Sequence, residues 1–173
     1  MTRPVLRRLV SAVPPVLRRA VVGRVVLWTQ PRFLIGVCSV LTAPDGRILL
    51  LEHRFWNGGK WGVPSGHMGH RESPQRTATR ELLEETGLRP RDLRIARVVT
   101  GLEHRVEIWM RGMIDIDEAP PREDLQQREI TDARLLPLPE ALRVMRPGQA
   151  EVVRAVLAED SPGAIASGRP GRV

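Results

Sequence analysis

The chain has 173 residues, enough for one domain with a modest extension, and its 42% apolar and 27% charged residues are ordinary globular values. Its single cysteine, Cys38, excludes an intramolecular disulfide and a cysteine metal cluster, so we expect a reducing, cytoplasmic setting. The net charge is +7, but Lys60 is the only lysine among 27 basic residues. Such an arginine bias is typical of a codon preference, and we do not expect nucleic acid as a partner.

Residues 1–30 are basic and are predicted to be helical. Two short amphipathic helices are expected over residues 5–28, broken at Pro14 and Pro15. The apolar positions at helical spacing are Leu17, Val21, Val25 and Trp28. The segment either packs on its own domain or on the partner of a homodimer, or makes a peripheral contact with an anionic membrane surface. No apolar stretch approaches the roughly 20 residues of a spanning helix, and the prolines disfavour a signal peptide.

Strands and helices alternate irregularly through residues 31–160. Alternating or continuous apolar stretches predict strands over 33–42, 47–53, 94–100, 105–116 and 132–136, with a short extended piece over 61–64. Helices are predicted over 74–85 and over 140–157, the second interrupted near Pro147. The order indicates an α/β domain of packed layers. Residues 161–173 are rich in Gly, Pro and Ser and are expected to be disordered.

The predicted helix over 74–85 carries a cluster of acids. Ser73 is suited to cap its start, and Gly87 its end. Glu81, Glu84 and Glu85 follow at i, i+3 and i+4, so they share one face, where their charges repel. A hard divalent cation, Mg²⁺ or Mn²⁺, would remove that repulsion. Taken alone, such a cluster is more often a solvated acidic face.

The wider segment from Gly66 to Leu88 resembles the Nudix box. That motif is Gly, five residues, Glu, seven residues, Arg-Glu, an aliphatic residue, any residue, Glu-Glu, any residue, Gly and an aliphatic residue. The positions that match are Gly66, Glu72, Arg80, Glu81, Leu82, Glu84, Glu85, Gly87 and Leu88. A match of this length is specific, unlike a lone short motif. Ser65 and Arg71 stand where the family commonly has glycine.

The resemblance implies an α/β/α sandwich with a mixed β-sheet, and it covers about residues 33–157. It implies that Glu84 and Glu85 are the main ligands of Mg²⁺ or Mn²⁺, that the carbonyl of Gly66 ligates as well, and that Glu81 is a further ligand or the base. Glu81, Glu85 and Arg80 are the catalytic residues that the resemblance implies within the box. Glu72 is expected to brace the loop, and Arg80 to orient the glutamates. The implied reaction is hydrolysis of a phosphoanhydride bond in a nucleoside diphosphate derivative or nucleotide.

Other site residues are less constrained by the sequence. Glu129 lies in the region after the box where family members often use one more catalytic acid, although an ordinary surface role is equally expected. Arg54 and Lys60 flank a glycine loop and are candidates for phosphate contacts. Three aromatic residues, Phe55, Trp56 and Trp109, are candidates for base stacking, but core or surface roles are more common. The four histidines show no metal spacing and receive no role.

Subfamily markers do not select a substrate. His104 stands where ADP-ribose pyrophosphatases often have proline, and the chain has no tyrosine, which dinucleoside polyphosphate hydrolases often carry. The alternatives are a non-catalytic Nudix-fold sensor that binds a nucleotide, an isomerase of the same fold, and a membrane- or RNA-associated module using the basic N-terminus. The isomerase needs a cysteine in a characteristic context, whereas Cys38 lies in a plain apolar strand. The complete set of acids favours the hydrolase.

Overall fold

The protein is described here by a computed structural model that covers residues 24, 28, 32–56, 61–121, 123, 125, 129–158 and 164–167. Internal contacts divide the chain into two compact units, Met1–Arg32 and Phe33–Val173. Of the first unit only Arg24, Trp28 and Arg32 are described, and the first two are helical and exposed. The remainder of the predicted N-terminal helices lies outside the described residues, so those helices stay a prediction.

A mixed β-sheet forms the centre of the second unit. Its strands are β1 (Leu34–Thr42), β2 (Ile48–His53), β3 (Trp61–Gly62), β4 (Ser65–His67), β5 (Arg91–Leu102), β6 (Arg105–Met113), β7 (Ile130–Leu136) and β8 (Ala164–Ser167). The order is β3-β2-β1-β6-β5-β8, with β4 paired to β1 and β7 to β2. Strands β1 and β6 run parallel, from Leu34 opposite Arg105 to Thr42 opposite Met113, whereas β5 and β6 form an antiparallel pair.

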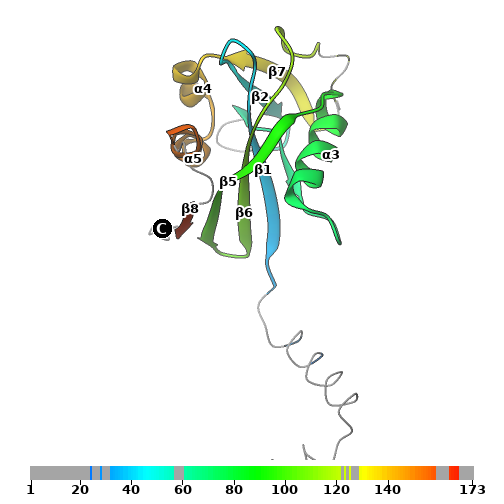
Figure 1. Ribbon diagram of the computed structural model, residues 1–173, viewed down its shortest axis with the longest axis vertical. Coiled ribbons are helices and arrows are strands. Elements are labelled where there is room, and N and C mark those ends of the chain that lie inside the picture. The colour runs from blue at the N-terminus through cyan, green and yellow to red at the C-terminus, as the bar shows by residue number, and fades with distance from the viewer. Residues whose placement is uncertain are drawn as a thin grey trace, which may run out of the picture. The chain divides into compact units, whose positions relative to one another are not determined.

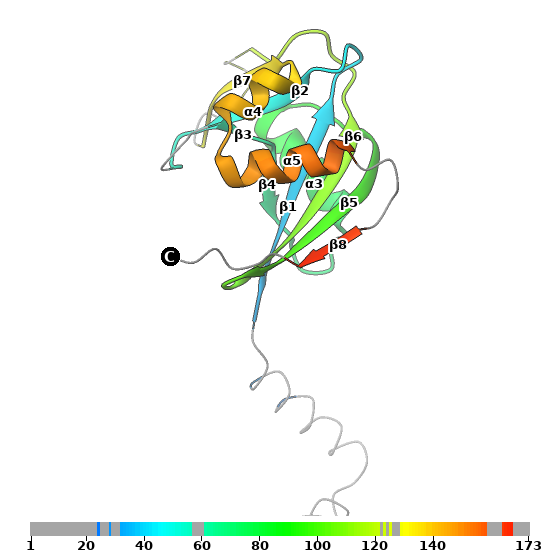
Figure 2. The same ribbon diagram turned by 90° about the vertical axis from the view of Figure 1, so that its left-hand side faces the viewer.

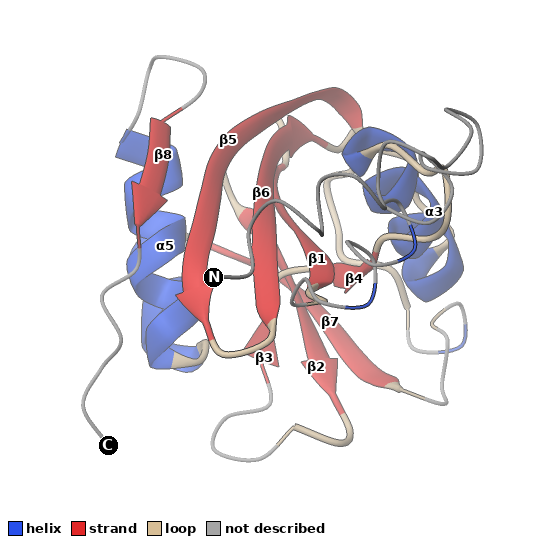
Figure 3. Ribbon diagram, turned by 90° about the horizontal axis from the view of Figure 1, so that it is seen from below, coloured by secondary structure: helices blue, strands red, loops and turns tan. Residues whose placement is uncertain are grey.

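Helices cover both faces of this sheet. They are α3 (Pro74–Thr86), α4 (Leu138–Val144) and α5 (Pro147–Ala158). Figure 1 and Figure 2 show α4 and α5 together on one side, and Figure 3 shows α3 and α5 on opposite sides of β1, β5 and β6. The predicted α/β/α sandwich with a mixed sheet is therefore confirmed.

The two helical layers explain why β1 and β2 are apolar on both faces. Val40 and Leu50 belong to the core cluster that includes residues of α4 and α5. Their neighbours Leu41 and Leu49 join the cluster on the other face, with Leu82 of α3. A strand buried on both faces has no solvated side chains, so its sequence reads as a continuous apolar run rather than an alternation.

Helix α3 begins and ends where its capping residues predict. The Ser73 side chain accepts a hydrogen bond from the backbone N–H of Arg76, and Pro74 occupies the first turn, where it has no hydrogen bond to lose. At the other end Gly87 adopts φ of 72° and donates its N–H to the carbonyl of Leu83. Glycine takes this left-handed conformation without steric cost, so it ends the helix cleanly.

Two predictions about the fold need correction. The segment 161–173 was expected to be disordered, but Ala164–Ser167 forms β8, parallel to β5. An open sheet edge can order a short segment whose composition alone indicates disorder. The extended piece expected over 61–64 is a strand only at Trp61–Gly62, where β3 pairs with β2, and a further short strand that was not predicted, β4, follows at Ser65–His67 and pairs with β1. The interruption between α4 and α5 at Pro147 is confirmed.

Candidate active site

Helix α3 presents its three acids to different environments. Glu85 is buried, with 7% of its surface exposed, because it lies on the face that packs toward the sheet. The Glu81 side chain is half-buried and the Glu84 side chain is exposed. One turn of helix therefore carries carboxylates from the protein interior out to solvent, as the i, i+3 and i+4 spacing predicts.

Arg80 joins the loop before α3 to these acids. Its Nε and Nη2 donate to the two oxygens of Glu72 at 2.9 and 3.1 Å. Its Nη1 donates to Glu81 at 2.9 Å and to Glu84 at 3.2 Å, and its Nη2 also reaches the carbonyl of His67. A guanidinium offers five N–H donors in one plane, so Arg80 is able to hold loop and helix together.

Glu72 is the acceptor on which the loop is organised. One of its oxygens also accepts from the backbone N–H of Gly69 at 2.9 Å and from the Thr77 hydroxyl at 3.0 Å. The hydrogen bond from Arg80 first, and that from Gly69 next, lower the pKa of Glu72 to about 2. This carboxylate is therefore charged throughout the neutral range and occupied by the protein, which suits a bracing role and leaves metal binding to α3.

Gly66 of β4 lies in direct contact with the Glu81 side chain. A Cβ at position 66 would overlap the Glu81 carboxyl group. Only a residue without a side chain allows the strand to approach the acid this closely. The structure thus brings together the backbone of Gly66 and the carboxylate of Glu81.

Glu85 is a buried carboxylate without a compensating partner. Its Oε2 has no hydrogen-bond partner among the described residues. Its pKa is raised to about 9, mainly by burial and further by the negative charges of Glu81, Glu129 and Glu84. A buried carboxyl oxygen without a partner, beside further carboxylates, is the chemistry that a hard divalent cation satisfies. Within the described residues no three acids or histidines are already gathered as a ligand cage, so binding an ion requires these side chains to converge.

Glu129 lies immediately before β7. Its side chain is exposed, its carbonyl accepts the backbone N–H of Arg54 at 2.8 Å, and its charge acts on Glu85. Glu129 and the box acids line the same cavity. Arg54 is exposed and is not among the described residues that line that cavity, and Lys60 lies outside the described residues.

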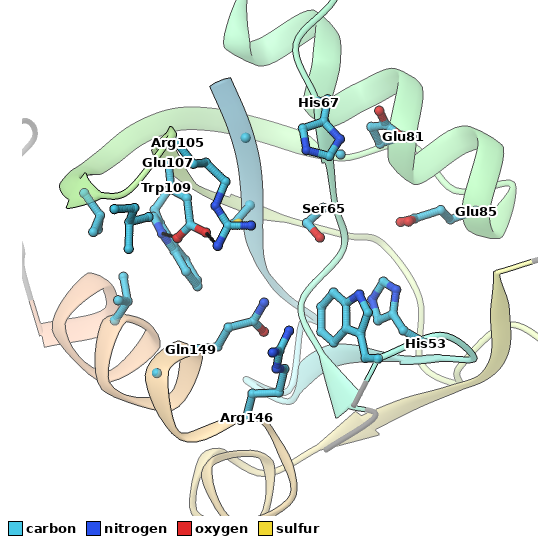
Figure 4. A pocket seen from close by; sticks show the side chains of 18 of the residues that line it. His53, Ser65, His67, Glu81, Glu85, Arg105, Glu107, Trp109, Arg146 and Gln149 are labelled. Carbon is cyan, nitrogen blue, oxygen red and sulfur yellow. Dashed lines mark hydrogen bonds and ion pairs between the residues drawn. The ribbon is translucent and has the colours of Figure 1, made fainter. Parts of the chain in front are cut away.

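A cavity of about 900 Å³ extends from the acids toward α5. Figure 4 shows Glu81, Glu85 and His67 at one side, and Arg105, Glu107, Trp109 and Gln149 at the other. Apolar side chains of β5 and α5, namely Val99, Leu102 and Val152, complete the wall. A volume of this order suits a nucleotide-sized ligand, and the wall combines these apolar side chains with many charged and polar ones.

The wall contains side chains that no sequence motif marked. The rings of His53 and Trp56 stack, with centroids 3.6 Å apart and planes 4° apart, and the Arg146 guanidinium lies 4.9 Å from the centre of the Trp56 ring. Burial, and secondarily the charge of Arg146, lower the pKa of His53 to about 4, so the ring is neutral near pH 7. Trp56 is already engaged in stacking, Trp109 is buried, and Phe55 is largely exposed.

Comparisons with known proteins agree with the fold and the box. The family model described as the NUDIX domain matches residues 32–156. A protein of Mycobacterium tuberculosis, named provisionally as 8-oxo-dGTP diphosphatase 3, is 35% identical over 56% of this chain and 50% of its own length. The CMP-5'-(N-acetyl-N-hydroxy-3-aminopropyl)phosphonate hydrolase of Streptomyces rubellomurinus is 34% identical over 64% of this chain and 56% of its own. The chain thus spans about half the length of these curated relatives.

A solved structure extends the likeness to most of the fold. The NUDIX domain of Shewanella oneidensis NrtR, complexed with ADP ribose, superposes with a TM-score of 0.62 at 17% identity. The match covers 91% of this chain and 98% of that one. No helix in the described part of the chain is both long and apolar enough to cross a membrane. With the complete box and the family match over residues 32–156, the chain belongs to the Nudix hydrolase family.

Proposed function

We propose that this protein hydrolyses a phosphoanhydride bond in a nucleotide or nucleoside diphosphate derivative, with Mg²⁺ or Mn²⁺ as cofactor. The observation that carries the proposal is Glu85, a buried carboxylate with an unpartnered oxygen that faces Glu81, Glu84 and Glu129 at one side of a nucleotide-sized cavity. Leaving such a group uncompensated costs stability, and a binding site for a cation explains its retention.

The residues that would hold the ion are Glu81, Glu84, Glu85 and the carbonyl of Gly66. They offer hard oxygen donors, which Mg²⁺ and Mn²⁺ prefer. When bound, the ion neutralises phosphate charge and lowers the pKa of the attacking water. The bidentate pair of Arg80 with Glu72 holds the helix against the loop, which would orient the acids of α3 as they close on the ion.

Glu129 is our choice for the general base. It is exposed at the cavity, and its carboxylate is able to accept a proton as water attacks phosphorus. The new P–O bond forms as the bond from phosphorus to the bridging oxygen breaks, and the leaving phosphate carries away the electron pair. Arg54 stays a candidate phosphate contact from outside the cavity wall, and Lys60 a candidate by sequence alone.

The names of the two curated relatives support a nucleotide substrate. One refers to a deoxyguanosine triphosphate derivative and the other to a cytidine monophosphate conjugate. The cavity is wide enough for a nucleoside, and its apolar wall of Val99, Leu102 and Val152 suits the faces of a base.

The test measures metal-dependent release of phosphate or nucleotide from a panel of candidate substrates. It spans nucleoside triphosphates including 8-oxo-dGTP, nucleotide sugars, ADP-ribose and CMP conjugates, each with Mg²⁺ or Mn²⁺ and with chelator. We expect turnover that disappears with chelator and in Glu85→Gln, but persists in Glu140→Gln, an exposed acid of α4. Binding without turnover under all conditions would refute the hydrolase and favour the nucleotide sensor.

Three expectations, about oligomeric state, membrane contact and cellular location, stay predictions. A homodimer, a peripheral membrane contact through residues 1–30, and a cytoplasmic location all depend on segments or assemblies that lie outside the described residues. Co-sedimentation with anionic vesicles, compared between the full chain and a chain lacking residues 1–30, tests the membrane contact. Light scattering over a concentration series tests the dimer.

A further inference from the structure

The end of the cavity away from the acids contains a carboxylate whose orientation is set by its own strand. One oxygen of Glu107 of β6 forms an ion pair with Arg105 Nη2 at 2.8 Å, and the other accepts a hydrogen bond from Trp109 Nε1 at 3.1 Å. The side chain is 16% exposed, so little of it contacts bulk solvent. Each oxygen has more than one lone-pair position, so both are still able to accept a further hydrogen bond.

The sheet exposes this carboxylate to the cavity. Side chains alternate along a strand, so Arg105, Glu107 and Trp109 stand on the same face of β6. The residue opposite Glu107 on β1 is Gly36, and a Cβ at that position would lie 3.7 Å from Glu107 Cγ. Gly36 therefore leaves the space beside Glu107 open, and Figure 4 shows Glu107 and Arg105 at the rim of this space.

Gln149 lines the same part of the cavity as Glu107 and adds a hydrogen-bond donor. Gln149 of α5 accepts the backbone N–H of Val63 at 3.2 Å through Oε1. That bond fixes the amide orientation and leaves its NH₂ group as donor. Gly62 lies beneath, where a Cβ would overlap both Gln149 and Trp56. The cavity therefore combines a fixed acceptor on β6 with a fixed donor on α5, beside the apolar side chains of Val99, Leu102 and Val152.

We propose that Glu107 is a specificity-determining residue that reads the Watson–Crick edge of a guanine-type base. Guanine presents two adjacent donors, N1–H and the 2-amino group, which match the two oxygens of one carboxylate. Adenine offers an acceptor at N1 beside its amino group, and uracil offers a single donor between two acceptors, so either places a lone pair against the carboxylate. The inference rests on the proposed function, because it assumes that the cavity takes a nucleotide.

The test compares two nucleotides that differ by one group. IMP lacks only the 2-amino group of GMP, and neither contains a phosphoanhydride bond, so binding is measured without turnover. We expect calorimetry to give a dissociation constant for GMP about tenfold lower than for IMP, which is the size expected for one hydrogen bond to a charged acceptor. Glu107→Gln should lose that preference, because its amide offers one acceptor and a donor that opposes N1–H. AMP and UMP should bind more weakly than GMP.

Matched variants separate base reading from structure. Glu103→Gln, an almost fully exposed acid in the turn between β5 and β6, should keep the preference for GMP. Thermal unfolding reports whether Glu107→Gln is folded. Should it fail to fold, Glu107→Asp keeps the charge but shortens the reach, and is expected to lose the preference as well. Equal affinity of the natural chain for GMP and IMP, or a preference that survives in a folded Glu107 variant, would overturn the proposal.

Failure of this inference and failure of the proposed function are distinguishable. Metal-dependent turnover that is lost in Glu85→Gln, without a GMP preference, refutes the role of Glu107 and leaves the hydrolase standing. A GMP preference without any turnover supports Glu107 and refutes the hydrolase. If monophosphates bind too weakly to measure, the ratio of kcat/KM for GTP and ITP replaces the binding ratio, with the same expected loss in Glu107→Gln. Neither binding nor cleavage of any nucleotide would overturn both.

Discussion

The two sides of the cavity are built in different ways. The acidic side comes mainly from one stretch, Gly66 to Glu85, in which a loop and a helix are joined by Arg80 and Glu72, and Glu129 adds one acid from just before β7. The opposite side is assembled from β2, β6 and α5, which lie far apart in the sequence. The acidic side is largely a local motif, whose residue spacing is visible in the sequence. The opposite side forms only when distant segments come together in the folded sheet. Substitutions should therefore affect reactivity on one side and selectivity on the other.

The largest effect is expected at Glu85. Glu85→Gln removes a charge that the proposed ion needs, and we expect turnover to fall about 10³-fold or more, since several kcal/mol of ion-dependent stabilisation is lost. Initial rates over a series of Mg²⁺ concentrations measure this. Unchanged rates at saturating Mg²⁺ would show that Glu85 is not a ligand.

The same variant has a pH signature in the metal-free protein. The pKa of Glu85 is about 9 when folded and is ordinary when unfolded, so between about pH 4.5 and 9 the folded state holds a proton that the unfolded state has released. Stability therefore falls as pH rises through this window. With chelator present, we expect Glu85→Gln to be more stable than the natural chain at pH 8. At pH 5 this difference in stability should be smaller. Thermal unfolding at both pH values tests this, and parallel pH curves would contradict it.

The next largest effect is expected at Arg80. Lysine keeps the charge but cannot form the bidentate pair with Glu72 while also reaching Glu81 and Glu84. We expect Arg80→Lys to weaken Mg²⁺ activation about 10- to 100-fold, as for other residues that orient metal ligands. The matched control is Arg76→Lys, an exposed residue one turn earlier on α3. Equal metal dependence in the two variants would remove Arg80 from the bracing role.

Gly66→Ala tests the close approach of β4 to α3. The added Cβ overlaps the Glu81 carboxyl group, so either the acid or the strand has to move. We expect a loss of about 1–3 kcal/mol in the free energy of unfolding, as for other overpacked sites, and reduced Mg²⁺ affinity. Gly148→Ala is the control for stability, since a Cβ there meets no atom within 4 Å. Urea unfolding of both variants measures the difference, and equal midpoints would contradict the prediction.

The smallest effect is expected at Arg71. This exposed residue adopts φ of 61°, in the left-handed region that favours glycine, and it stands where the family commonly has glycine. Glycine removes the strain of the left-handed conformation in the folded state, but it also gives the unfolded chain more conformational entropy. The first effect on the free energy of unfolding is the larger, so Arg71→Gly should stabilise the protein by about 0.5–1 kcal/mol. A rise in Tm measures this; a fall would show that the arginine side chain makes a compensating contact.

Much of the fold was predictable because its signals are local. Ser73 and Gly87 mark the ends of α3, and the continuous apolar runs of β1 and β2 indicate strands covered on both faces. The disorder predicted for residues 161–173 was wrong for Ala164–Ser167, because pairing with β5 depends on an open edge elsewhere in the chain.

The sequence by itself determined the acids of α3 and the ends of that helix, because helical periodicity and capping residues act over a few positions. The family and the α/β/α architecture followed from the resemblance of residues 66–88 to the Nudix box. Only the tertiary structure decided that Glu85 is buried with an oxygen that has no partner among the described residues, that His53, Trp56 and Arg146 form a stack, and that Glu107 and Gln149 line the same cavity. Burial, charge and cavity shape depend on which distant segments meet. In this chain, that meeting follows from parallel pairing of β1 with β6 and from the packing of α5 on the sheet.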